Sequence, residues 1–132
     1  MLLRCENNGR IRYAGAHEDL LIFRAATGRC DASPSTGIWA SIVPDIEAGQ
    51  IDETEVVLQR GDVLLLHTDG ITEARNLAHV TFGLERLMQS FESVGARSVD
   101  DIRAHIIEAA RCWGPEITDD RTLVVVRYVG AP

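Results

Sequence analysis

Short apolar runs separated by turn residues dominate the first half of the chain and predict β-strands. Residues 2–5 and 11–14 are the arms of an expected hairpin, with Gly9 free to take a positive φ in the turn between them. Further strands are expected at residues 20–24, 55–59, 63–67 and 122–129. An irregular connection is expected at residues 31–54, which contain Pro34, Gly37, Pro44 and Gly49.

The strand predicted at residues 63–67 begins with four consecutive apolar residues. Alternation of apolar and polar residues indicates a strand with one face in solvent, whereas a continuous apolar run fits a strand that is buried on both faces. We therefore expect residues 63–67 to lie in the interior of the protein.

Apolar residues at helical spacing predict two helices in the second half of the chain. The first stripe consists of Leu84, Leu87, Met88 and Phe91, and the second of Val99, Ile102, Ile106, Ala109 and Trp113. Ser98 is a candidate N-cap of the second helix, which Gly114-Pro115 should end. Strands, then two helices, then a closing strand indicate an α+β fold with helices packed on a mainly antiparallel sheet.

Length and charge limit the classes of protein to which the chain can belong. Its 132 residues, 45% of them apolar, suit one domain with one sizeable core. A net charge of −7 with scattered Lys and Arg argues against a nucleic-acid partner, which requires a clustered basic face. The apolar run at residues 63–66, which no other run exceeds in length, is too short to cross a membrane. Three widely spaced cysteines, without a signal peptide, predict reduced thiols in a cytoplasmic protein.

Two acidic positions stand out by their place relative to the strands. Asp69 follows the buried strand and precedes Gly70, whose bare backbone permits close approach to a ligand. Asp119 and Asp120 directly precede the last strand, so they share one rim with Asp69 if the two strands are antiparallel neighbours. Clustered carboxylates repel one another and favour a hard divalent cation, Mg²⁺ or Mn²⁺. Spacing alone also allows a turn at Asp69-Gly70 and a solvated loop at Asp119-Asp120.

Several stretches resemble one known family. Residues 61–76, with the sequence GDVLLLHTDGITEARN, closely resemble the signature stretch of the SpoIIE-type branch of the PPM family, which consists of metal-dependent protein serine/threonine phosphatases. Phe82-Gly83 follows at the expected distance, and residues 119–123, DDRTL, are similar to the family's last metal motif. Residues 11–17 are similar to its strand and Gly-His segment, although Ala16 stands between the glycine and the histidine. The resemblance covers nearly the whole chain in the right order.

The resemblance implies a mainly antiparallel β-sandwich flanked by an antiparallel helix pair, with two Mn²⁺ or Mg²⁺ ions at one edge. In the family these ions activate the water that attacks phosphorus, and no phosphoenzyme forms. Asp69 and Asp119 are the positions that match metal ligands, and Asp120 stands where relatives vary. The implied activity is hydrolysis of phosphoserine or phosphothreonine on a regulatory protein, in relatives often a small phosphorylated anti-sigma-factor antagonist.

The chain departs from the family at its N-terminal side. The acidic motifs that supply the family's other metal ligands have no counterpart in residues 1–60. Residues 1–132 are therefore expected to be the C-terminal portion of a phosphatase domain, inactive or poorly active alone. Two functions stay open, a phosphatase and a non-catalytic module that binds such a partner. Unpaired sheet edges in an incomplete sandwich also predict a homodimer or a domain-swapped assembly.

Five other residues near these motifs have expected roles. Gly70 and Asp120 adjoin the metal positions and are candidates to support them. Arg75 is a candidate for contacting a phosphate or for steadying a helix start, and His17 for orienting a loop near the substrate. His67 lies on the strand predicted to be buried, so packing in the core is its expected role, in place of metal binding.

Overall fold

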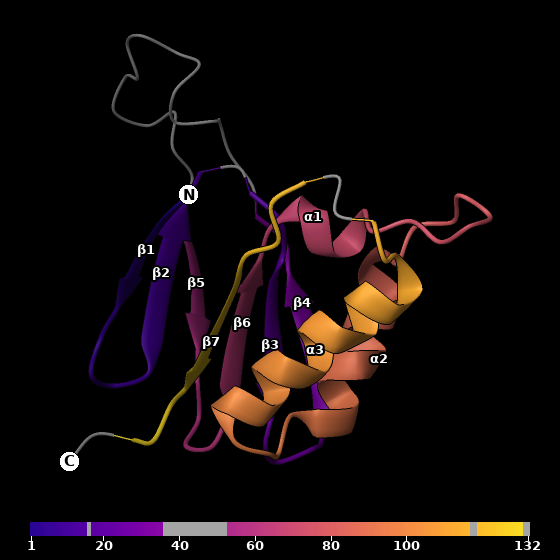
Figure 1. Cartoon of the computed structure of the whole chain (residues 1–132). Helices are drawn as coiled ribbons and strands as arrows, with labels where there is room; N and C mark the ends of the chain where they lie inside the picture. Colours follow the sequence, from indigo (N-terminus) through magenta and orange to yellow (C-terminus); the bar gives the residue numbers. More distant parts are fainter. Residues whose placement is uncertain (16, 36–52, 117–118, 131–132) are drawn as a thin grey trace, which may run out of the picture.

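The strands form two antiparallel sheets in the computed structural model, which describes residues 1–15, 17–35, 53–116 and 119–130 (Figure 1). The first sheet has the order β1-β2-β5, with the bounds β1 Leu2–Cys5, β2 Arg10–Ala14 and β5 Thr54–Val57. The second has the order β4-β3-β6-β7, with the bounds β3 Leu20–Arg24, β4 Arg29–Ser33, β6 Val63–His67 and β7 Leu123–Arg127. The hairpin expected at the start of the chain is confirmed, and Gly9 has φ +83° in its turn.

The prediction of an irregular connection was wrong at its start, because Arg29–Ser33 form β4 and pair with β3. Within this edge strand only Cys30 is buried, so the sequence lacks the apolar pattern from which a strand is predicted. The rest of that connection, residues 36–52, lies outside the described residues.

The two predicted helices are confirmed and cover the outer face of the second sheet (Figure 1). They are α2, Gly83–Val94, and α3, Val99–Trp113. The Ser98 hydroxyl accepts a hydrogen bond from the backbone N–H of Asp101 at 3.1 Å, so Ser98 caps α3 as the sequence predicted. A further short helix, α1, Asp69–Thr72, follows β6 directly and was not predicted.

The second sheet divides the core into two apolar clusters because successive side chains of a strand point to opposite faces. Val63 and Leu65 pack with the helices, whereas Leu64 packs with residues of the first sheet. The expectation that β6 is buried on both faces is therefore confirmed. The three layers are the first sheet, the second sheet and the helix pair, which is the α+β sandwich that the sequence and its resemblance predicted. No helix in the described part of the chain combines the length and the apolar character needed to cross a membrane.

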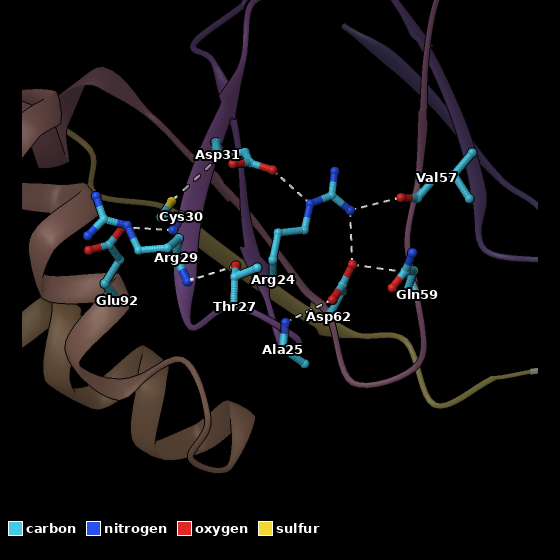
Figure 2. A network of polar contacts seen from close by, with 10 residues as sticks. All are labelled: Arg24, Ala25, Thr27, Arg29, Cys30, Asp31, Val57, Gln59, Asp62 and Glu92. Atoms are coloured by element: carbon cyan, nitrogen blue, oxygen red, sulfur yellow. Dashed lines mark hydrogen bonds and ion pairs between the residues drawn. The ribbon is translucent and has the colours of Figure 1, made fainter.

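A buried ion pair ties the two sheets together at the start of β6 (Figure 2). The Arg24 guanidinium donates to the Asp62 carboxylate and to the Val57 carbonyl, each at 2.9 Å. Asp62 is 2% exposed and also accepts hydrogen bonds from the backbone N–H groups of Ala25 and Gln59, at 2.9 and 3.0 Å. Arg24 comes from β3 of the second sheet and Val57 from β5 of the first, so one guanidinium joins both layers.

A second polar contact fixes α2 against the edge strand β4 (Figure 2). The Glu92 carboxylate accepts a hydrogen bond from the backbone N–H of Cys30 at 2.8 Å and lies 3.5 Å from the Arg29 guanidinium. Burial, with a smaller contribution from the negative charge of Glu92, raises the pKa of the Cys30 thiol to about 12. Cys30 is therefore a protonated, free thiol inside the core.

Replacing Asp62 with asparagine should destabilise the fold strongly. The Asp62→Asn variant loses the ion pair with Arg24. It also places an amide N–H₂ group next to neighbours that are all hydrogen-bond donors, so we expect the free energy of unfolding to fall by about 3 kcal/mol. Asp31→Asn is a matched control, because Asp31 also pairs with Arg24, at 2.8 Å, but its side chain is 57% exposed. The control should lose less than about 1 kcal/mol. Urea unfolding measures both values, and equal losses would contradict this account of the network.

Candidate active site

The ends of β6 and β7 meet as the sequence analysis expected. The two strands are antiparallel neighbours, with His67 opposite Leu123. Beyond this pair, the backbone N–H of Thr68 donates to the Thr122 carbonyl at 3.2 Å. The segment that leaves β6 and the segment that enters β7 therefore lie side by side, although 52 positions separate Thr68 from Asp120.

The Thr68 side chain holds these two segments together. Its hydroxyl donates to the backbone carbonyl of Asp120 at 2.8 Å and accepts from the backbone N–H of Thr122 at 3.0 Å. One hydroxyl thus satisfies a donor and an acceptor of the opposite segment. No pattern in the sequence assigns a role to Thr68, and the available signal is its place between the buried strand and Asp69.

Gly70 is required at its position by the close approach of a neighbouring backbone. A Cβ atom at residue 70 would lie 2.4 Å from the carbonyl oxygen of Asp120 and 3.3 Å from that of Asp119. From the sequence, the bare backbone of Gly70 is expected to permit the approach of a ligand. In the structure the group that approaches is the peptide of residues 119–120.

Asp69 and Asp119 are both exposed at this rim, and each is oriented by a backbone N–H. One oxygen of Asp69 accepts from the N–H of Gly70 at 2.9 Å, and one oxygen of Asp119 accepts from the N–H of Asp120 at 2.7 Å. Among the described residues, no hydrogen bond or ion pair engages the second oxygen of either carboxylate. Each side chain therefore offers a carboxylate oxygen to solvent.

These carboxylates suit a hard divalent ion in chemistry but supply only part of a ligand set. Mg²⁺ and Mn²⁺ prefer oxygen ligands, and an unpaired carboxylate oxygen on each side of one rim provides them. Within the four described stretches of chain, no three His, Cys, Asp or Glu side chains are grouped so as to hold a metal ion. A complete coordination shell at this rim needs additional ligands or water molecules.

The structure places Asp120, Arg75 and His17 differently. Asp120 lies at the rim through its backbone, and its side chain is exposed. Arg75 follows α1, and it lines a separate hollow of about 380 Å³ together with Pro115 and Glu116. His17 lines a hollow beside the rim, together with Thr68 and Thr122. Of these three candidates, only Asp120 and His17 are therefore brought to the junction of β6 and β7.

His67 is buried in the core, as its place on β6 predicted, and is 2% exposed. Burial lowers the pKa of its imidazole, so the ring is neutral at physiological pH. Its Nδ1 lies 3.3 Å from the carbonyl oxygen of Thr68 and must donate, because a carbonyl can only accept. The other ring nitrogen, Nε2, is buried without a hydrogen-bond partner among the described residues.

Solved structures with the same fold include phosphatase domains. The phosphatase domain of SpoIIE from Bacillus subtilis, presoaked with Mn, superposes with a TM-score of 0.70 at 20% identity, over 96% of this chain and 54% of that one. The SiaA-PP2C domain of Pseudomonas aeruginosa gives a TM-score of 0.73 at 18% identity, over 91% of this chain and 47% of that one. For the RsbU and RsbW domains of Rv1364c from Mycobacterium tuberculosis the TM-score is 0.70 at 22% identity, over 95% and 34% of the two chains.

The chain thus spans about half of the length of the first two of these proteins. No curated protein matches it significantly in sequence. The family model "Stage II sporulation protein E (SpoIIE)" matches residues 2–129, which is nearly the whole chain. This match over nearly the whole chain shows that the chain belongs to the SpoIIE family.

Proposed function

We propose that this chain is part of a metal-dependent protein phosphatase that removes phosphate from serine or threonine of a regulatory protein. The observation that carries the proposal is the junction of β6 and β7, which brings Asp69 and Asp119 to one exposed rim. Family membership adds support, because the matched structures are phosphatase domains. Asp69 and Asp119 are the proposed metal ligands, and Asp120 and Gly70 support them from the same rim.

The proposed cofactor is Mn²⁺ or Mg²⁺. Such ions, when bound, lower the pKa of water and neutralise charge that develops on a phosphoryl group. The chain's own residues supply the negative charge and its placement. The N–H groups of Gly70 and Asp120 each hold one carboxylate oxygen and leave the other free. Thr68 fixes the spacing between the two segments, so the carboxylates are positioned by the backbone before either binds a cation.

The proposed substrate is a phosphorylated regulatory protein in the cytoplasm, for which an anti-sigma-factor antagonist is the leading candidate. One matched structure contains RsbU and RsbW domains, and another is the SpoIIE domain described as a cell fate determinant. All three cysteines of the chain are free, which fits a reducing compartment. His17, beside the rim, and Arg75, in a separate hollow, are the candidates for contacting the phosphoprotein.

The first test is the binding of Mn²⁺ to the chain of 132 residues. A partial carboxylate site has low charge and few ligands, so we expect a dissociation constant of roughly 10⁻⁴–10⁻³ M by calorimetry. Mn²⁺ should broaden the amide NMR signals of residues 69–70 and 119–120, and Asp69→Asn should remove this effect. Asp100→Asn, an exposed carboxylate in the first turn of α3, is the control and should leave binding unchanged. Tight binding of two ions would show that the ligand set is more complete than proposed.

The second test is catalysis. We expect the chain alone to release little phosphate from p-nitrophenyl phosphate or a phosphoserine peptide. A version extended at its N-terminus to the full length of a SpoIIE-type phosphatase domain should show Mn²⁺-dependent turnover. In that protein Asp69→Asn should lower kcat/KM at least about 100-fold, since it removes a ligand's charge, and the melting temperature should change little because Asp69 is exposed.

Full activity of the Asp69→Asn variant would refute the assignment of the site. A different result, in which the extended protein binds a phosphorylated anti-sigma-factor antagonist but releases no phosphate from it, would support the non-catalytic alternative. Asp100→Asn again serves as the control, with no expected change in turnover.

The third test concerns self-association. Within the described part of the chain, each sheet has edge strands without a further pairing partner, and exposed apolar residues lie on or next to them, such as Leu2, Val57 and Val129. We expect a homodimer or a domain-swapped assembly whose population rises with concentration. Size-exclusion chromatography with light scattering over a range of concentrations measures it. A molar mass equal to that of the monomer at every concentration would show that these edges do not drive self-association.

A further inference from the structure

The side chain of Arg121 connects the candidate active site to the end of α3. Its guanidinium Nη2 donates to the backbone carbonyls of Gly114 and Glu116, each at 2.9 Å. Gly114 is the C-cap of α3, and carbonyl groups at a helix C-terminus favour a cation because they lack partners within the helix. Arg121 therefore holds the segment that carries Asp119 against the end of a helix.

Gly114 is itself packed against the chain that follows α1. A Cβ atom at residue 114 would lie 2.7 Å from both the backbone N and the carbonyl oxygen of Arg75, and 3.0 Å from the carbonyl carbon of Ala74. Only glycine fits here unless one of the two backbones moves. The end of α3 thus has a fixed position relative to the segment that continues from Asp69 through α1.

Two groups of contacts hold residues 119–122 beside α1 (Figure 1). Thr68 bonds to the carbonyl of Asp120 and to the N–H of Thr122, which fixes the distance between this segment and β6. Contacts at one place leave a segment free to rotate about them, whereas contacts at a second place fix its orientation. Arg121 supplies the second place, and its contacts are with the end of α3 instead of β6.

We propose that Arg121 is a positioning residue, which sets the place of the Asp119 carboxylate relative to Asp69 by holding its segment against the end of α3. The inference rests on the proposed function, in which these two carboxylates share a metal ion. It adds that metal affinity depends on a guanidinium that is directed to backbone carbonyls. Replacing residues that hold metal ligands in place typically changes metal affinity about 10–100-fold.

Arg127, near the other end of β7, is a matched control. Its Nη2 also donates to two backbone carbonyls, those of Gly95 and Arg97 in the connection between α2 and α3. Arg121 and Arg127 are both partly exposed, so loss of either guanidinium should lower the melting temperature to a similar extent. Only Arg121 lies beside the rim. A general loss of stability therefore affects both variants, whereas a change in position at the rim affects one.

The first measurement needs no metal and compares variants of the full chain by NMR relaxation. Methionine approaches arginine in length but has no donor. We expect backbone order parameters of about 0.85 for residues 119–120 in the unmodified chain and in Arg127→Met, and values below about 0.6 in Arg121→Met. Arg121→Lys should keep most of this order, because one ammonium group can donate to both carbonyls.

The second measurement is a titration with Mn²⁺. In the unmodified chain Mn²⁺ should broaden the amide signals of residues 69–70 and 119–120 together. Arg121→Met should weaken binding about tenfold, and it should reduce the broadening at residues 119–120 more than at residues 69–70. Arg127→Met should leave the affinity and the pattern of broadening unchanged, and Arg121→Lys should restore most of the affinity.

Two results would overturn the inference. One is an order parameter at residues 119–120 that Arg121→Met does not lower, and the other is an equal loss of Mn²⁺ affinity in Arg121→Met and Arg127→Met. If Mn²⁺ broadens no signal at the rim of the unmodified chain, the proposed function fails instead. The order parameters then still decide whether Arg121 positions the segment, so the two failures are distinguishable.

Discussion

The antiparallel pairing of β6 with β7 is the interaction on which the rest of the structure depends. β6 lies between β3 and β7 in the second sheet, with the helices on one face and the first sheet on the other. Its five residues are therefore surrounded, and their apolar side chains contribute to both clusters of the core. Because β7 enters the sheet where β6 leaves it, the pairing also sets the position of every residue at the candidate active site.

The start of β6 contributes to the link between the two sheets, and its end contributes to the candidate active site. At the start, the Asp62 carboxylate accepts three hydrogen bonds, one of them from Arg24. Because Arg24 also donates to the carbonyl of Val57, this network links the second sheet to the first. At the other end, Thr68 joins the segment after β6 to the segment before β7 through its hydroxyl. The first end stabilises the sandwich by a buried, fully hydrogen-bonded charge. The second end leaves the carboxylates of Asp69 and Asp119 exposed, with one oxygen of each held by a backbone N–H.

The same junction holds His67 in the core. The side chain of His67 is buried, and its Nδ1 is oriented by the carbonyl of the next residue, Thr68. A hollow that His17 lines shares Thr68 and Thr122 with the carboxylate rim.

The sequence by itself determined the elements whose patterns are local. Consecutive apolar residues identified β6 as a strand buried on both faces, the stripe from Val99 to Trp113 identified α3, and Ser98 identified its start. The order of Asp69 and Asp119 around the helices indicated a shared rim and the family. β4 could not be predicted, because only Cys30 of that edge strand is buried. Only the tertiary structure shows that Thr68 is the hydrogen-bonding link, that Gly70 leaves space for the peptide of Asp120, and that Nε2 of His67 has no partner among the described residues. These three facts depend on contacts between residues distant in sequence, for which no local pattern of polarity exists.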